Sequence, residues 1–482
     1  MASCARSGRR KQQAQPGVNR SLDAFIIALN QASDGRRWYT STKQLQLASL
    51  EFCAACRSTL RLHVRVDRDT PTRLWMGAPA RETRSAKRLS STRVPVVRAR
   101  AVAWKLSALA LRSMGDVLSR VKSLRLDKEY NGDLRGVNWP ASLENLMFLG
   151  VFKRSLQGVT WPVSLKSLLL LKVEQPLAEV SWPPSLQSLM FGAIPDESIS
   201  GVAWPVSLTW LHLGHGFNQP IDTVAWPPSM EILHFGNDFN QPIAGVTWPT
   251  SLIRLSFGGA FNQPLDMATW PGSLQTIEFG FRFNQPLGGV QWPASLQQLT
   301  LDSNFQHLAG DIAWPASLHQ LTLGSSFNQP LAGVSWPPSL LRLEFGVKFN
   351  QPIAGVSWPD SLQEITFSGY VEIISVLYPR KIPVESQRGV LSNFNQPITE
   401  VRWPPSLLKV TFGDFFDQSV DGVAWPASLK ELAFGRDFRS PDSSFEWPAS
   451  LQQLTIARRP SEPLLSWPGL RVIGIWRPYW DS

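Results

Sequence analysis

A Trp-Pro dipeptide recurs along this chain at a regular spacing of 22 residues. It occurs fifteen times between Trp139-Pro140 and Trp467-Pro468, and only one interval, of 45 residues, departs grossly from that period. A fixed period of this length is the signature of a repeat protein whose units stack into a solenoid. The repeat therefore predicts the fold, with one insertion in an otherwise regular array.

Each unit carries the same apolar anchors after the tryptophan. In one representative unit the anchors and the asparagine that follows them are Trp248, Leu252, Leu255, Phe257, Phe261 and Asn262. Anchors two positions apart face the same side of an extended segment, so we expect one short β-strand per unit. Proline removes a backbone donor and holds the preceding residue extended, which places Trp-Pro in the irregular return segment. Because one unit cannot bury its own anchors, neighbouring strands must stack in parallel.

Polar residues also recur in step with the repeat. Seven units contain an unaltered Phe-Asn-Gln-Pro, and a serine precedes the first leucine anchor, as at Ser251 and Ser295. We expect asparagines such as Asn240 and Asn284 to bond the turn amides of adjacent coils, and the serine hydroxyls to bond nearby backbone. The alternative for the asparagines is a polar ligand-binding row.

The frame Trp-Pro-x-Ser-Leu-x-x-Leu-x-Phe-Gly, followed by Phe-Asn-Gln-Pro-Ile, resembles the FNIP repeat family. This resemblance covers about Val117 to Trp476, where a degenerate coil at 117–138 lacks the Trp-Pro. It implies a leucine-rich-repeat-like solenoid of about sixteen coils. Members of the family often join such repeats to an F-box, which would imply a substrate-recognition adaptor of a ubiquitin ligase.

Composition and apolar pattern divide the chain outside the repeats into several expected segments. Residues 21–66 show an apolar pattern of the size of an F-box, which predicts a small helical module, but they lack the Leu-Pro opening typical of an F-box. The insertion is either a partner-binding protrusion or a loop that is tolerated because loops lengthen cheaply. The expected segments are a basic leader at 1–20, a poorly defined basic region at 21–100, a capping helix at 101–116, the solenoid at 117–476 with its insertion at 368–393, and a tail at 477–482.

Charge is divided unevenly along the chain. Residues 1–136 hold 27 Lys+Arg and 10 Asp+Glu, whereas residues 137–482 hold 20 and 27, so the solenoid itself is not basic. Nucleic-acid or anionic-surface binding is therefore an alternative only for residues 1–100. The sequence contains no apolar run long enough to span a membrane. Three cysteines, none in the repeats, predict an intracellular protein, cytoplasmic or nuclear.

No catalytic or metal site is predicted, and no cofactor is implied. Cys53 and Cys56 have the spacing of half a zinc site, but they share a helical face with apolar residues and are better explained as core. His212 and His234 occupy equivalent slots of adjacent coils, with no third ligand in step with them. Because no nucleophile, phosphate loop or metal motif appears, we expect a non-enzymatic protein.

Variable positions within the fixed frame are the candidate binding residues. The positions that flank the second strand anchor should face outward, and they vary while the anchors do not. We predict that this strand face recognises a protein or peptide, with Trp210, Ile232, Arg254 and Arg342 contributing most; the alternative is a plain solvent-facing sheet. The full set of candidates is Met147, Leu169, Met190, Trp210, His212, Ile232, His234, Arg254, Glu278, Arg342 and Glu344.

Overall fold

The computed structural model covers the repeats and part of what precedes them. It describes residues 121–126, 130–307, 309–367, 392–439, 441, 444–458, 467 and 469–476, and the backbone of strands at 63–66 and 96–98. The chain divides into two compact units, Met1–Lys172 and Val173–Ser482. The predicted leader, the helix at 101–116, the cysteine pair, most of the insertion and the tail lie outside the described residues. The F-box-sized segment also lies outside them, except for its last four residues.

The second unit is a ladder of short parallel strands joined by irregular segments, with one turn of 3-10 helix, η1 (Ala309–Asp311). Its strands are β6 (Ser188–Phe191), β7 (Trp210–His212), β8 (Ile232–His234), β9 (Arg254–Ser256), β10 (Thr276–Phe279), β11 (Gln298–Leu301), β12 (Gln320–Thr322), β13 (Arg342–Glu344), β14 (Glu364–Thr366), β15 (Lys409–Thr411), β16 (Glu431–Phe434), β17 (Gln453–Arg458) and β18 (Arg471–Trp476).

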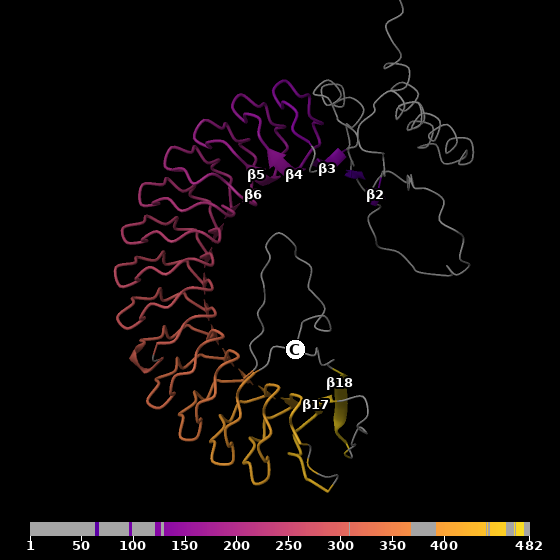
Figure 1. Ribbon diagram of the computed structural model, residues 1–482, viewed down its shortest axis with the longest axis vertical. Helices are drawn as coiled ribbons and strands as arrows, with labels where there is room; N and C mark the ends of the chain where they lie inside the picture. Colours follow the sequence, from indigo (N-terminus) through magenta and orange to yellow (C-terminus); the bar gives the residue numbers. More distant parts are fainter. Residues whose placement is uncertain are drawn as a thin grey trace, which may run out of the picture. The chain divides into compact units, whose positions relative to one another are not determined.

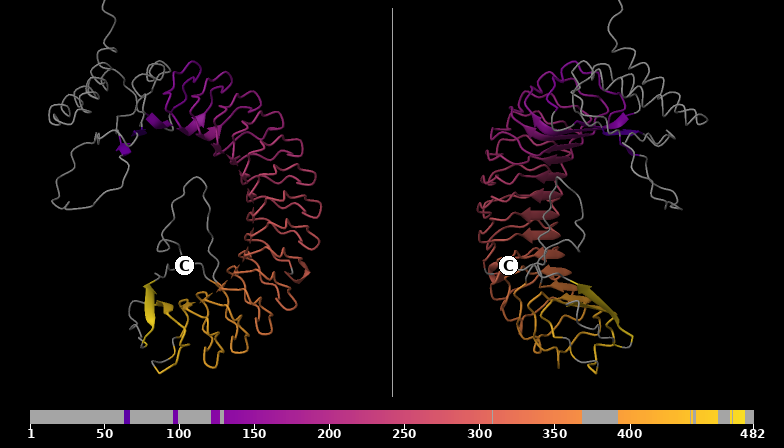
Figure 2. Two further views of the ribbon diagram at one scale, coloured as in Figure 1. Left: turned by 180° about the vertical axis from the view of Figure 1, so that it is seen from behind. Right: turned by 45° about the vertical axis from the view of Figure 1, so that its right-hand side comes forward.

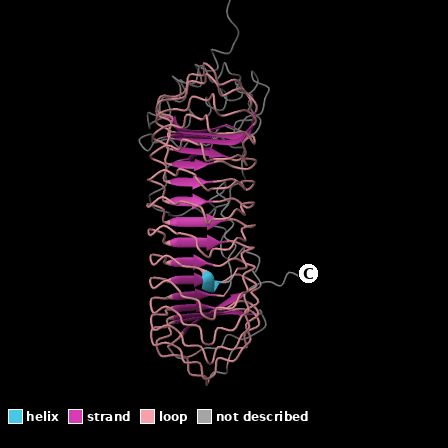
Figure 3. Cartoon of the chain, turned by 90° about the vertical axis from the view of Figure 1, so that its left-hand side faces the viewer, coloured by secondary structure: helices cyan, strands magenta, loops and turns pink. Residues whose placement is uncertain are grey.

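The ladder keeps the register that the repeat dictates. Leu255 lies opposite Leu233 on one side and Ile277 on the other, and each of these is its counterpart in the adjacent coil. The strands point the same way (Figure 3), and within this unit the coils follow a curve whose inner side carries the strands (Figures 1 and 2). The predicted leucine-rich-repeat-like solenoid, with one parallel strand in each coil, is therefore confirmed.

Stacked aromatic rings form much of the core of the second unit. Phe261 is fully buried, and its ring lies parallel to those of Phe239 and Phe283, with centroids 6.1 Å away in each case. Phe257 packs on Phe261 within the same coil at 4.2 Å. Leu252, Leu255 and Trp248 are buried beside them. The repeat phenylalanine thus packs against the equivalent phenylalanine of the next coil, as stacking of identical units requires.

The polar residues of the repeat join one coil to the next. The Oδ1 of Asn240 accepts the amide of Asn262 at 2.8 Å, and the Oδ1 of Asn262 accepts the amide of Asn284 at 2.8 Å. The hydroxyl of Ser251 donates to the carbonyl oxygen of Met230 at 2.7 Å, in the preceding coil. The hydroxyl of Ser295 likewise donates to Leu274 at 2.7 Å. The expected structural role of both residue types is therefore confirmed.

The insertion does not interrupt the ladder. β14 pairs directly with β15, so that Ile365 lies opposite Val410 although the whole insertion separates them in the sequence. The amide of Asn395 donates to the Oδ1 of Asn350 at 2.9 Å, which is the same bond that Asn262 and Asn240 make between two regular coils. The two coils that flank the insertion therefore stack as neighbours.

The first unit contains strands that the sequence pattern did not reveal. β1 (His63–Val66) pairs antiparallel with β2 (Val96–Arg98) and with β3 (Val121–Leu126). On its other side β3 pairs in parallel with β4 (Asn145–Phe152), whose hydrogen-bonded neighbour is β5 (Ser167–Val173). An antiparallel strand thus lies along the edge of the first coil.

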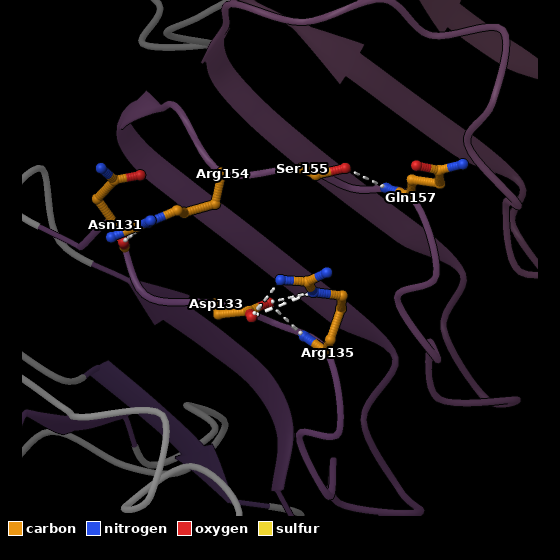
Figure 4. A network of polar contacts seen from close by, with 6 residues as sticks. All are labelled: Asn131, Asp133, Arg135, Arg154, Ser155 and Gln157. Atoms are coloured by element: carbon orange, nitrogen blue, oxygen red, sulfur yellow. Dashed lines mark hydrogen bonds and ion pairs between the residues drawn. The ribbon is translucent and has the colours of Figure 1, made fainter.

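The degenerate first coil keeps the asparagine bond of the regular repeat. Tyr130 is buried in the position of the repeat phenylalanine, and the next residue, Asn131, accepts the amide of Lys153 through Oδ1 at 3.0 Å. Exposed polar contacts surround this turn (Figure 4), including the ion pair of Arg135 with Asp133 at 2.9 Å. The frame thus survives without a Trp-Pro, as the sequence predicted.

Candidate functional site

Two columns of half-exposed side chains run along the strands of the second unit. In β9, Leu255 is buried, while Arg254 and Ser256 on either side of it are partly exposed. The same alternation holds at β7, where Trp210 and His212 flank the buried Leu211, and it places Ile232, Glu278, Arg342 and Glu344 at partly or fully exposed positions. In the first unit, Met147 and Leu169 occupy the equivalent half-buried positions on β4 and β5.

Two candidates are less exposed than the pattern predicts. Met190 and His234 are each only 7% exposed. Met190 lies opposite His212 in the ladder, and His234 lies opposite His212 on the other side and against the ring of Trp210. Large neighbours in adjacent coils thus cover them, which corrects the expectation that both columns are open to solvent along their length.

Trp210, His212 and His234 form one cluster of rings. The Trp210 ring centroid lies 6.3 Å from that of His212 and 5.9 Å from that of His234, and the two imidazoles are 6.0 Å apart. The Nδ1 of His212 lies 2.9 Å from the carbonyl oxygen of Phe191 and 3.1 Å from the amide nitrogen of Gly214. Each neutral tautomer of His212 therefore has a backbone partner at Nδ1.

Burial keeps these imidazoles neutral at pH 7. It lowers the pKa of His234 to about 4, with smaller contributions in the same direction from His212 and Arg254. Burial also lowers the pKa of His212, partly offset by the bond to Phe191. The cluster is therefore an uncharged aromatic surface on β7 and β8.

The depressed pKa of His234 predicts acid destabilisation. The unfolded chain binds this proton near pH 6.5 and the folded protein only near pH 4, so the stabilisation is complete above pH 6.5 and is lost as the pH falls toward 4. For His234 alone we expect a loss on the order of 2 kcal/mol at pH 5. Denaturant unfolding of the wild type and of His234→Gln at pH 7.5 and 5.0 measures it. A variant with the full wild-type pH dependence would contradict the assignment.

The charged members of the face differ in whether they are paired. The Nε of Arg342 lies 3.2 Å from a carboxylate oxygen of Glu364, and the Nζ of Lys409 lies 3.2 Å from one of Glu431. Among the described residues Arg254 has no ion pair. Sequence reasoning missed the paired state of Arg342, although opposite charges at the same position of adjacent coils were the signal that reveals it.

Neither a metal nor a membrane site emerges from the described residues. They contain no group of three or more His, Cys, Asp or Glu side chains that could hold a metal ion. No helix among them is long and apolar enough to cross a bilayer. Over β6 to β16 the face offers contact surface, hydrogen-bonding groups and the guanidinium of Arg254.

Comparison with known proteins identifies the repeat. Residues 239–282 and 327–370 match the FNIP Repeat family. The chain therefore contains FNIP repeats at these two places. The first matched segment includes the anchors from Trp248 to Asn262 and the candidates Arg254 and Glu278, so those FNIP repeats carry both the core and part of the strand face. No curated protein matches the chain.

The solved structures that the chain resembles include a leucine-rich-repeat protein. The crystal structure of CroV588, described as a novel circular LRR protein, is 32% identical with a TM-score of 0.55 over 69% of this chain and 49% of that one. The chain thus spans about half the length of CroV588. An internalin (inlF) from Listeria monocytogenes is 12% identical with a TM-score of 0.38, over 71% of this chain and 92% of that one.

Proposed function

We propose that this protein is a non-enzymatic scaffold that binds a protein partner through the strand face of its FNIP repeats. The supporting observation is the contrast between the strand anchors and the positions that flank them. The aliphatic and phenylalanine anchors of the strands recur and are buried, while the flanking columns vary and most of their described side chains are partly or fully exposed. Concave repeat surfaces of this kind are common protein-binding sites.

The part of the proposed surface that we expect to contribute most of the binding energy lies on β7 to β9. Trp210 lies opposite Ile232, and Ile232 lies opposite Arg254, so the three side chains occupy one column on adjacent strands. Tryptophan and arginine are the residues that most often dominate binding energy, because they bury a large area and also supply polar contacts. An isolated threonine, such as Thr322 farther along the face, contributes little.

Affinity capture with a matched pair of variants tests this function. Tagged wild type, Trp210→Ala and Phe281→Ala are used as bait, and retained proteins are quantified by mass spectrometry. Phe281 is 55% exposed on the turn after β10, so it controls for loss of an exposed aromatic away from the strand face. Heparin in the buffer suppresses capture through the basic N-terminal region.

We expect a partner that the wild type and Phe281→Ala retain and that Trp210→Ala loses by about tenfold or more. Thermal melts of the three proteins should coincide within a few degrees, which shows that the loss is one of contact and not of fold. If all three baits retain the same proteins in equal amounts, the strand face is not the binding surface.

A further inference from the structure

We infer that the strand face over β7 to β9 binds a peptide segment in which a carboxylate lies next to an apolar side chain. Arg254 would bind the carboxylate, and Trp210 with Ile232 would contact the apolar group. This inference rests on the proposed function and specifies the chemistry of the partner.

The first observation is that Arg254 has no ion-pair partner among the described residues. Over strands β6 to β16, the two exposed columns contain three cations, and two of these, Arg342 and Lys409, are bonded to carboxylates of the neighbouring strand. Arg254 has no such partner among the described residues, and its side chain is half-buried. A partly desolvated guanidinium gains most from a bidentate carboxylate, because the planar fork matches its two oxygens.

The neighbours of Arg254 define the rest of the ligand. On the preceding strands the same column holds Ile232 and then Trp210, and adjacent parallel strands are about 4.8 Å apart. The neutral rings of His212 and His234 adjoin Trp210 and add aromatic surface. An apolar side chain on the ligand can therefore contact Trp210 or Ile232 while a carboxylate one or two residues away reaches Arg254.

The charge around Arg254 argues against a polyanion as the ligand. Residues 137–482 carry 20 Lys+Arg and 27 Asp+Glu, and Glu278, Glu344, Glu364 and Glu431 lie in the same two columns. A nucleic acid or an anionic membrane laid along these strands would be repelled. A single carboxylate beside an apolar group avoids that repulsion and meets Arg254, the one cation of the two columns over β6 to β16 that has no ion pair among the described residues.

Selection from a random peptide library displayed on phage, with the full chain as target, tests the inference. Enriched sequences are synthesised, and their affinities are measured by fluorescence anisotropy for the wild type, Trp210→Ala, Arg254→Gln and Arg282→Gln. Arg282 is exposed on the turn after β10, so Arg282→Gln makes the same charge change away from the strand face.

We expect enriched peptides to carry Asp or Glu within two residues of an aliphatic or aromatic residue. Arg254→Gln and Trp210→Ala should each weaken binding about tenfold or more, and Arg282→Gln should leave it unchanged. Replacing the acidic residue of the peptide by its amide should weaken wild-type binding by a similar factor and have no further effect on Arg254→Gln.

Other outcomes separate the two proposals. Peptides that depend on Trp210 but tolerate both Arg254→Gln and the amide replacement would overturn this inference and leave the strand face as the binding surface. Peptides insensitive to both Trp210→Ala and Arg254→Gln would count against the proposed function as well. If no sequence is enriched, the face does not recognise linear segments and the inference fails, while the affinity capture still decides the proposed function.

Discussion

Gly236→Ala is expected to destabilise the second unit by at least about 4 kcal/mol or to prevent its folding. A β-carbon at this position would lie 1.3 Å from the carbonyl oxygen of Gly214 and 2.2 Å from its carbonyl carbon. Both atoms belong to the backbone of the preceding coil, so neither can move without breaking the ladder. The soluble yield and a thermal melt followed by circular dichroism measure the effect.

Gly272→Ala is the matched control for this substitution. A β-carbon there meets nothing within 4 Å, and the backbone is not in the left-handed region. We expect its stability to stay within about 1 kcal/mol of the wild type. The two variants make the same chemical change in the same fold, so a Gly236→Ala protein as stable as Gly272→Ala would show that the coils do not approach as closely as the structure has them.

Phe261→Ala is expected to cost about 3 to 5 kcal/mol. The ring is fully buried and packs against Phe257 in its own coil, at 4.2 Å, and against Phe239 and Phe283 in the adjacent coils. Its removal leaves a cavity that the coils on either side cannot close, because their spacing is fixed by the strand hydrogen bonds. Denaturant unfolding measures the loss of stability.

The surface-exposed Phe281 provides the control for Phe261. Phe281→Ala removes the same ring from a position that is 55% exposed, and we expect a change of less than about 1 kcal/mol. Because each coil contacts only its neighbours, hydrogen exchange in Phe261→Ala should rise first in the coils next to residue 261. A loss below about 1 kcal/mol in Phe261→Ala would be inconsistent with a continuous aromatic core.

Much of the candidate site was predictable because it inherits its geometry from the repeat. The period of the Trp-Pro dipeptides alone predicts that Trp210, Ile232 and Arg254 share one column, and the ladder pairs them in that order. The sequence did not indicate which side chains of the strand face are exposed to solvent and which of its charges are already paired. His234 is covered by Trp210 and His212, and Arg342 is bonded to Glu364, in each case through side chains from other coils.

The N-terminal strands mark another limit of sequence reasoning. β1 and β2 lie outside the repeat, so no periodicity predicts that β1 pairs antiparallel with β3. Gly236, which follows β8, is a subtler case. Its backbone is not left-handed, and glycine is needed there because the carbonyl of Gly214 in the preceding coil approaches it so closely.

The sequence by itself determined the parallel ladder, its register, the buried anchors and the asparagine bonds, because identical units that stack in register must place each position over its own copy. The tertiary structure alone decided which half-exposed side chains are covered, which charges are paired and where backbone meets backbone. Those outcomes depend on contacts between different residues of neighbouring coils, and a period common to all coils carries no information about them.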